Sequence, residues 1–290
     1  SKGALIFDGK PHGIDTRVFL NSEGLPTYEG KELGLAYKEF TDFGKIDLNV
    51  HVVAVEQISF FKVTFKVEEL LDPKTFKDKQ YHMAYEFVGL KKGKMSSRKG
   101  KVVLAEDILD EAHKKIKKLV DERGEPKLDT EEIEKIAVGA VKLSFLKMSP
   151  YKYLAFDLNA SLSFEGDSGP YVQYTYARAK SILRQAHSSS LTAQSQRLRE
   201  VLNTEEEMSV IRLLRRFPEV VQEAGEDYSP HLIANYLFDL AQRFNSFYKK
   251  HPVLKADKKD KEARLSLVAA TAQVIKNGLY LLGIKTLEKM

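Results

Sequence analysis

Short apolar runs and helical stretches alternate over the first hundred residues. The clearest run is Asn49–Val55 (NVHVVAV), which is rich in valine and contains no Gly or Pro, as a buried strand requires. A helical pattern follows at Gln57–Leu71, and a second strand-like run lies at His82–Leu90. Strand–helix–strand order with nearly continuous apolar strands predicts a parallel α/β sheet. Earlier elements are also expected, namely strands at Ala4–Phe7 and Val18–Leu20 and a helix at Tyr28–Phe40.

The pattern beyond residue 100 is helical. The segment 230–250 is the clearest helix, because Pro230 suits the first helical position and apolar residues such as Ile233, Leu237 and Phe244 recur on one face. Asp129 and Glu132 predict a capping box at the start of another helix. The segment Pro150–Phe164 is irregular and aromatic. The helices expected in this part lie at about 103–122, 129–147, 170–188, 204–216, 230–250 and 258–282, and a helical bundle is the economical interpretation of 169–290.

The charge divides the chain at a similar place. Residues 1–168 hold 27 Lys and Arg against 28 Asp and Glu, a net charge of −1. Residues 169–290 hold 19 against 13, a net charge of +6. A basic half joined to a balanced half predicts a polyanion-binding module, and a merely soluble basic helical domain is the alternative.

Composition excludes several kinds of site. Cysteine is absent, which rules out disulfides, thiolate metal sites and cysteine nucleophiles. The seven histidines show no metal-like clustering, so we expect no protein-bound metal. No run of 18 uncharged apolar residues occurs, and the first twenty residues lack the features of a secretion signal. We therefore expect a soluble, cytoplasmic protein that does not bind membranes.

The segment Lys91–Lys101 (KKGKMSSRKGK) is the first candidate for chemistry. It holds six basic residues, two glycines, two serines and no acid. A positively charged loop between a strand and a helix suits the charge that develops on a triphosphate. A solvated basic turn is the alternative. The order KMSSRKG resembles the KMSKS loop of class I aminoacyl-tRNA synthetases, most closely the form found in arginyl-tRNA synthetases.

The resemblance to arginyl-tRNA synthetases extends over essentially residues 4–290. Gly24–Ala36 (GLPTYEGKELGLA) resembles the stretch that carries the family's arginine-binding tyrosine and acid, and Val55–Gln57 falls where the family has a glutamine at a strand end. Phe164–Arg178 (FEGDSGPYVQYTYAR) resembles the link into the anticodon-binding bundle and is the most specific block. The bundle itself is matched by Tyr236–Ala241, Phe244–Asn245, Phe247–Tyr248, Arg264–Leu265 and Leu282–Met290.

The resemblance implies an arrangement of parts and a reaction. Residues 1–105 are expected to form the second half of a Rossmann-like catalytic domain, 106–168 a stem-contact helical segment, and 169–290 an all-α anticodon-binding domain. The implied reaction activates arginine with ATP and transfers it to the arginine tRNA. Magnesium accompanies the ATP as substrate, and the full-length enzyme is expected to be a monomer.

Three residues are expected to bind arginine. Glu32 lies four residues after Tyr28 and so on the same helix face, and a carboxylate can accept two guanidinium N–H groups in parallel. Gln57 follows the strongest strand, although a role as helix cap is the alternative. The family usually has aspartate at the position of Glu32, where an exposed acid paired with a lysine is the other interpretation.

The loop residues are expected to contact ATP. The resemblance assigns a catalytic role to Lys94, Ser96 and Arg98. Ser97 stands where the motif has its second lysine, and Arg98, Lys99 or a residue outside this chain is expected to supply that charge. His82 is expected to face the nucleotide or to belong to the core. The full ATP set is His82, Lys94, Met95, Ser96, Ser97, Arg98 and Lys99.

The bundle is expected to contact tRNA through basic and aromatic side chains. Tyr236 and Tyr248 lie on or beside the apolar stripe, so a core role is the alternative for both. Met290 has no evident packing role in the sequence, and similar proteins use this end near the anticodon. The full set is Gln173, Tyr174, Arg178, Tyr236, Asn245, Tyr248, Arg264 and Met290.

One family motif is missing. No His-Ile-Gly-His tetrapeptide occurs, and His12–Asp15 (HGID) has the wrong order and opens no helix. We therefore expect a C-terminal portion that starts within the catalytic domain and does not activate arginine alone. A different class I synthetase and a non-catalytic RNA-binding module are the alternative interpretations.

Overall fold

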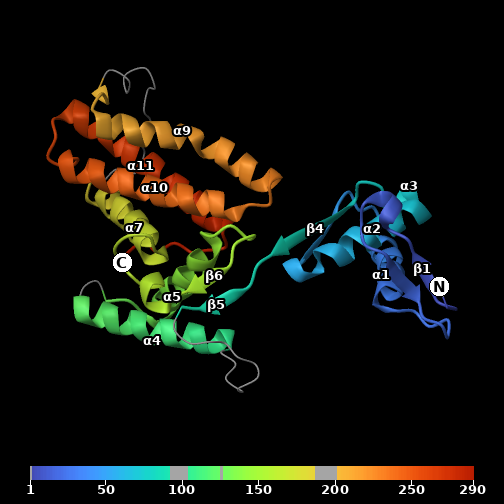
Figure 1. The fold of residues 1–290 in the computed structure, drawn as a ribbon. Helices are drawn as coiled ribbons and strands as arrows, with labels where there is room; N and C mark the ends of the chain where they lie inside the picture. The colour runs from blue at the N-terminus through green and yellow to red at the C-terminus, as the bar shows by residue number, and fades with distance from the viewer. Residues whose placement is uncertain (1, 92–103, 125–126, 187–200) are drawn as a thin grey trace. The chain divides into compact units, whose positions relative to one another are not determined.

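The computed structural model describes residues 2–91, 104–124, 127–186 and 201–290 (Figure 1). The chain divides into two compact units. The first comprises Ser1–Phe87 and Pro150–Tyr153, and the second comprises Val88–Ser149 and Leu154–Met290. The predicted order, an α/β part followed by a helical bundle, is confirmed.

The first unit contains two small sheets. Strands β1 (Leu5–Phe7) and β2 (Arg17–Leu20) are antiparallel, with a short 3-10 helix at Lys10–His12 between them. Strands β3 (Asn49–Ala54) and β4 (Gln80–Tyr85) pair in parallel, from Asn49 opposite Gln80 to Ala54 opposite Tyr85. The predicted parallel pairing is therefore confirmed for the valine-rich strand. The helical elements are α1 (Tyr28–Asp42), η2 (Val55–Gln57), α2 (Ile58–Leu71) and α3 (Pro73–Phe76).

Helix α1 packs closely on β2. The Thr27 hydroxyl caps α1 by accepting a hydrogen bond from the Gly30 N–H, and it also donates to the Val18 carbonyl at 2.6 Å. A Cβ at Gly30 would lie 2.3 Å from the Phe19 carbonyl oxygen, so only glycine allows this approach. Phe19 is buried with Val63 and Val67 of α2 in the small core of this unit. The start of α1, where Tyr28 lies, is thus fixed against the sheet.

The strand predicted at His82–Leu90 is divided in the structure. Strand β4 ends at Tyr85, and β5 (Val88–Leu90) belongs to the second unit, where it pairs in parallel with β6 (Leu154–Phe156). Between β4 and β5, the Glu86 N–H donates a hydrogen bond to the Pro150 carbonyl at 2.7 Å. The chain therefore changes its pairing partner at Glu86. Strand β6 lies in the segment predicted to be irregular, since three residues are too few for a visible alternation.

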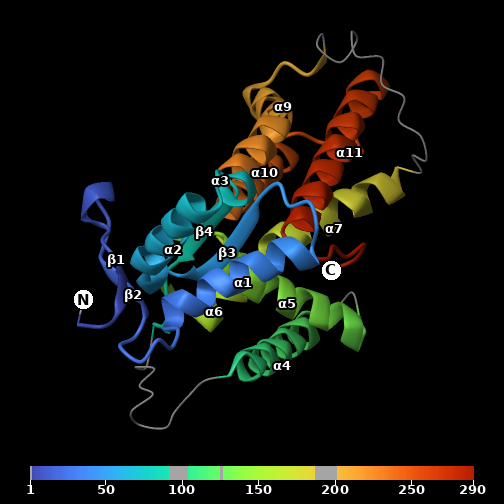
Figure 2. The same cartoon turned by 90° about the vertical axis from the view of Figure 1, so that its right-hand side faces the viewer.

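The second unit is mainly helical. Helices α7, α9, α10 and α11 pack together as one bundle, and α4 packs on α5 (Figures 1 and 2). The Asp129 capping box is confirmed, because Asp129 and Glu132 each accept a hydrogen bond from the other's N–H. The bounds are α4 (Ala105–Arg123), α5 (Thr130–Leu146), α6 (Leu158–Ser161), α7 (Gly169–Gln185), α9 (Glu205–Glu226), α10 (Pro230–Lys250) and α11 (Lys258–Leu281).

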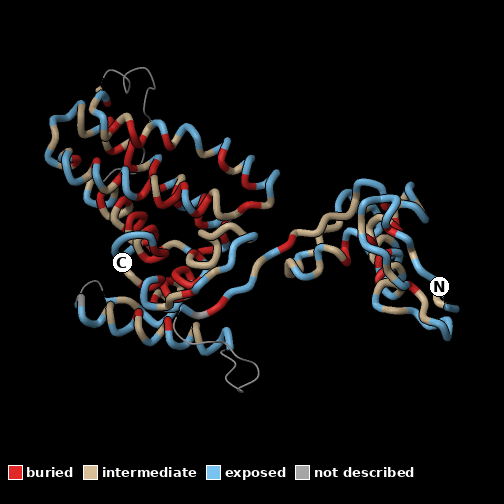
Figure 3. The backbone as a smooth tube through the Cα atoms, viewed as in Figure 1, coloured by how far each residue is buried: buried red, intermediate tan, exposed pale blue. Residues whose placement is uncertain are grey.

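Helix α9 extends ten residues beyond the predicted end at 216 and includes Pro218. Val220 and Ala224 lie on the same face after the proline and are buried in the bundle core. Burial of these side chains offsets the hydrogen bond that proline removes from a helix. Buried positions recur along the inward faces of the bundle helices (Figure 3).

The C-terminal residues pack on both parts of the second unit. Leu282 and Ile284 belong to the bundle core, whereas Leu287 is buried with residues of α4 and α5. Met290 also packs against this second core. The end of the chain therefore has a packing role that its sequence did not reveal.

Candidate functional sites

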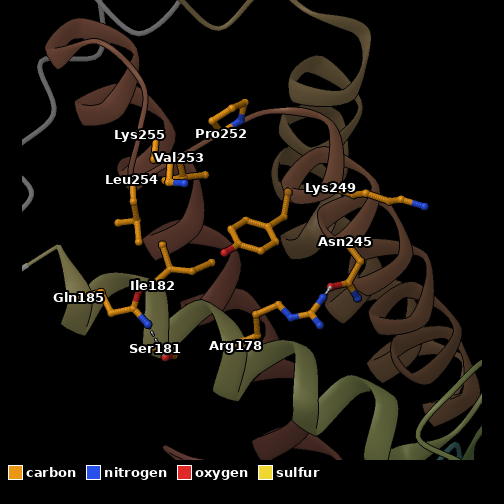
Figure 4. Close-up of a pocket in the computed structure, with 11 residues that line it drawn as sticks. Arg178, Ser181, Ile182, Gln185, Asn245, Lys249, Pro252, Val253, Leu254 and Lys255 are labelled. Carbon is orange, nitrogen blue, oxygen red and sulfur yellow. Dashed lines mark hydrogen bonds between the residues drawn. The ribbon is translucent and has the colours of Figure 1, made fainter.

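A pocket of about 820 Å³ opens in the bundle. Residues of α7, including Arg178 and Gln185, face the segment after α10 across the cavity (Figure 4). This volume is within the range of small-molecule and base-binding pockets. The lining residues are Arg178, Ser181, Ile182, Gln185, Asn245, Tyr248, Lys249, Pro252, Val253, Leu254 and Lys255.

The Arg178 guanidinium is held on several sides. Its NH1 donates to Asn245 Oδ1 at 3.0 Å, and its NH2 donates to the Tyr174 hydroxyl at 3.1 Å (Figure 4 shows the contact with Asn245). Its Cζ lies 4.8 Å from the ring centroid of Tyr174 and 5.9 Å from that of Tyr248. The cation is therefore placed before any ligand arrives, and its fork leaves N–H groups for an acceptor.

Asn245 is fixed in turn. Its Nδ2 donates to the Tyr171 hydroxyl at 3.0 Å and to Thr175 Oγ1 at 2.9 Å. Both hydrogens of the Asn245 side-chain amide are thus donated to residues of α7, and its oxygen accepts from Arg178. Tyr171 and Thr175 were missed by the sequence analysis, although their spacing from Arg178 puts both on the same helix face.

The structure brings four of the eight predicted tRNA residues together: Tyr174, Arg178, Asn245 and Tyr248. The other four lie elsewhere and make internal contacts. Gln173 is buried and donates to the carbonyls of Lys135 (3.1 Å) and Lys285 (2.8 Å). Tyr236 is 7% exposed and donates to the Leu213 carbonyl at 2.9 Å, and burial raises the pKa of its hydroxyl. Arg264 is paired with Glu207, and Met290 packs on the core of α4 and α5.

The three predicted arginine-binding residues lie in the first unit. The Tyr28 ring is 62% exposed and stacks on Phe60 with 4.5 Å between ring centroids. Glu32 is only 8% exposed, and among the described residues it has no hydrogen-bond or ion-pair partner. Burial raises the pKa of its carboxyl. Gln57 occupies the N-cap position of α2, and its side chain makes no capping hydrogen bond there.

Arg17 holds the neighbours of Tyr28 and Phe60. Its NH1 pairs with Glu29 at 2.8 Å, and its NH2 donates to the Ser59 hydroxyl at 3.0 Å. The starts of α1 and α2 are thereby tied together, which fixes the two stacked rings. Arg17 was not predicted from the sequence, since a lone basic residue on a short strand carries no signal.

His82 lies on β4 with its Nε2 3.0 Å from the Val53 carbonyl oxygen and its ring 4.5 Å from that of Phe61. These contacts tie the imidazole to the neighbouring strand and to α2. The other predicted ATP residues, Lys94, Met95, Ser96, Ser97, Arg98 and Lys99, lie outside the described residues.

A chain of part-buried polar contacts that ends at the buried Glu68 crosses the first unit and was not anticipated. Glu68 Oε2 accepts a hydrogen bond from Gln80 Nε2 at 2.6 Å, and Gln80 Oε1 lies 3.1 Å from His51 Nε2. Asn49 Nδ2 continues the chain, 3.1 Å from His51 and 2.8 Å from Glu39. Glu68 is fully buried, and its Oε1 has no hydrogen-bond partner among the residues that the structure describes. Burial raises the pKa of Glu68 to about 7, with Glu32 and Glu39 adding to the effect. Its spacing of seven from Phe61 was the available signal, because it places an acid on the apolar face.

The described residues offer neither a metal site nor a membrane span. No group of three or more His, Cys, Asp or Glu side chains among them is arranged to hold a metal ion. None of the helices that the structure describes combines the length and apolar character of a membrane span.

Two family models match successive parts of the chain. Residues 2–157 match the family model described as "tRNA synthetases class I (R), catalytic domain", and residues 172–290 match "DALR anticodon binding domain". The arginine–tRNA ligases of Pyrococcus furiosus and Thermococcus kodakarensis are 38% and 40% identical to the chain. Both alignments cover 100% of the chain and 52% of the relative, so the chain spans about half the length of these curated relatives.

A solved structure is similar over nearly the whole chain. The arginyl-tRNA synthetase of Thermus thermophilus superposes with a TM-score of 0.85 at 32% identity, and the match covers 99% of this chain and 54% of that one. The catalytic-domain model alone covers more than half of the chain. The chain therefore belongs to the class I arginyl-tRNA synthetase family.

Proposed function

We propose that this chain acts within an arginine–tRNA ligase and that its bundle binds the anticodon loop of the arginine tRNA. One unstacked loop base enters the 820 Å³ pocket, where the fixed Arg178 guanidinium and the Tyr248 ring receive it. The observation that carries the proposal is the prior fixation of Arg178 by Asn245 and Tyr174.

The pocket has the groups that single-stranded RNA requires. Unstacked bases are read by aromatic faces, guanidinium planes and polar side chains. Gln185 and Ser181 supply an amide and a hydroxyl at the pocket wall. Lys249 and Lys255 are exposed lining residues that suit the flanking phosphates. Binding is therefore expected to be both base-specific and salt-dependent.

The test is the affinity of this chain for three stem-loops at two salt concentrations. The first has the anticodon of the arginine tRNA, the second has altered anticodon bases, and the third comes from an unrelated tRNA. We expect a clear preference for the first. Equal affinities that fall steeply with salt would refute base reading and leave only a basic surface.

We also propose that the first unit contacts arginine through Tyr28, Glu32 and Gln57. Glu32 favours this role because its buried carboxylate has no hydrogen-bond or ion-pair partner among the described residues, and a guanidinium can donate two parallel hydrogen bonds to it. Tyr28 provides an exposed aromatic wall one turn earlier. In the proposed reaction ATP with Mg²⁺ is the second substrate, and the basic segment Lys91–Lys101 contacts its phosphates.

The chain alone is not expected to activate arginine. It contains no His-Ile-Gly-His tetrapeptide, which the family uses to hold ATP. Such catalysis depends on positioning and on charge stabilisation, so the loss of half of the ATP contacts is severe. Arginine-dependent ATP–pyrophosphate exchange by the pure chain would refute this expectation. We expect the full-length enzyme to be a cytoplasmic monomer.

A further inference from the structure

Three consecutive acids open helix α9, and each pairs with a cation. Glu205 pairs with Arg212 of the same helix. Glu206 pairs with Lys250 and with His251, whose Nε2 lies 3.1 Å away, at the end of α10. Glu207 pairs with Arg264 of α11, with 2.8 Å between Oε1 and Nε. The start of α9 thus anchors one end of each neighbouring helix.

Glu207 is the most constrained of the three acids. Its side chain is 1% exposed, and its Oε2 accepts hydrogen bonds from the N–H groups of Asn203 and Thr204 at 3.1 Å each. The Thr204 hydroxyl accepts in return from the Glu207 N–H, which completes a capping box. Burial acts to raise the pKa of Glu207, but the hydrogen bonds from Arg264 and Thr204 hold that pKa below its usual value.

Arg264 connects this anchor to the pocket. Its NH1 donates to the Pro252 carbonyl at 2.9 Å, and its side chain is only 13% exposed. Its NH2 lies 3.5 Å from Asp260 Oδ2. Pro252 begins the stretch Pro252–Lys255, which lines the pocket opposite α7 (Figure 4).

We propose that Arg264 is a positioning residue for the base pocket. Arg264 holds the wall Pro252–Lys255 in place through the Pro252 carbonyl and is itself held by Glu207. This deepens the proposed anticodon binding and rests on it. The rival role is a direct phosphate contact, which would suit a basic residue of an RNA-binding bundle. The two roles differ in whether the wall Pro252–Lys255 loosens in the absence of RNA when the contact with the Pro252 carbonyl is lost.

The test compares Arg264→Lys, Arg212→Lys and Lys255→Ala in stem-loop binding over a range of salt. We expect Arg264→Lys to weaken binding by about tenfold, the size of one lost charge-assisted hydrogen bond, with the salt slope unchanged. Lys255→Ala, which removes a rim cation, lowers the slope by about 1. Arg212→Lys is the matched control, since it replaces an arginine that pairs with another acid of the same run but does not line the pocket, and it leaves binding unchanged.

Unchanged affinity of Arg264→Lys would overturn the positioning role. Because lysine keeps the charge, the salt slope of this variant stays the same in either role, and the wall itself must be examined to separate them. If the unsubstituted chain shows no preference among stem-loops, the proposed function fails first, independently of Arg264.

Amide hydrogen exchange tests the wall contact without RNA. We expect faster exchange at Val253–Lys255 in Arg264→Lys, with unchanged exchange along the buried stretch of α10. Unchanged exchange at Val253–Lys255 would contradict the proposal. Exchange accelerated throughout the bundle would show that Arg264 supports the whole fold rather than this wall, and would overturn it as well.

Discussion

The two units differ in the partners that surround a buried glutamate. In the bundle, both oxygens of Glu207 accept hydrogen bonds, from Arg264 and from the start of α9. In the first unit, Glu68 accepts a hydrogen bond from Gln80, and its other oxygen is buried with no hydrogen-bond partner in the part of the chain that the structure describes. The pKa of Glu207 is accordingly lowered, whereas that of Glu68 is raised to about 7. The buried Glu207 of the bundle thus has a cation in this chain, whereas Glu68 of the first unit has none among the described residues.

The largest expected effect is the loss of stability in Glu207→Gln. The substitution leaves the largely buried Arg264 guanidinium with the part-exposed Asp260, 3.5 Å away, as its remaining charge partner. Removing one partner of a buried ion pair typically costs about 3–5 kcal/mol. Denaturant unfolding, with hydrogen exchange to separate the units, measures this loss. Glu205→Gln is the control, because Glu205 forms an exposed pair. A loss below about 1 kcal/mol, the size of an exposed pair, would contradict the structural role of Glu207.

The same substitution at Glu68 is expected to act in the opposite direction. Glutamine keeps an acceptor for Gln80 and removes the unfavourable charge, so Glu68→Gln stabilises the first unit above pH 7 by up to about 3 kcal/mol. Glu69→Gln, on the next residue of α2, is the matched control. Destabilisation by Glu68→Gln at pH 8 would mean that the carboxylate has a partner in the folded protein.

The pH dependence of stability should separate the units in the same way. The folded-state pKa of Glu68 lies above its ordinary value, so its contribution is fully present below about pH 4.5 and is lost as the pH rises through about 7. The pKa of Glu207 is lowered, so its contribution is present above about pH 4.5 and is lost in acid. As the pH rises from 5 to 8, the free energy of unfolding of the first unit, measured by hydrogen exchange, should fall, and that of the second unit should stay nearly constant.

A smaller effect is expected from Arg178→Lys on RNA binding. Lysine keeps the charge but loses the fork that contacts Asn245 and Tyr174, so affinity for the anticodon loop falls by about tenfold with the fold intact. Circular dichroism checks the fold, and a labelled stem-loop gives the affinity. Unchanged affinity would contradict the proposed role of Arg178 in binding the RNA base.

The smallest effect is expected from Lys249→Ala. Its side chain is exposed at the pocket rim, so its loss should lower the salt slope of binding by about 1 and weaken all stem-loops alike. A change in preference among the stem-loops would assign Lys249 to base reading instead.

The sequence predicted elements best where local signals agree. Helix α10 runs from Pro230 to Lys250 as expected, because a proline start and a long apolar stripe coincide. The predicted end of α9 was wrong, since the burial of Val220 and Ala224 outweighs the hydrogen bond lost at Pro218. Strand β6 was missed because three residues give no periodicity, and the division between β4 and β5 depends on a distant partner, Pro150.

The candidate site was predictable only in part. Tyr174, Arg178, Asn245 and Tyr248 come together, and their role in tRNA binding stays a prediction. Gln173 and Arg264 are polar residues in segments that resemble the family. Gln173, however, contacts a distant backbone carbonyl, and Arg264 contacts the Pro252 carbonyl and a buried acid far along the chain. Residue type gives no information about such partners, which only the packing of helices determines.

The most direct test of base reading in the bundle pocket is a double-mutant cycle between protein and RNA. It measures four affinities, for the unsubstituted chain and Arg178→Lys with the arginine anticodon loop and with a loop that has one altered anticodon base. If Arg178 receives that base, the two changes are strongly non-additive, and the double change weakens binding little more than either single change. Additive losses at every anticodon position would contradict the proposal.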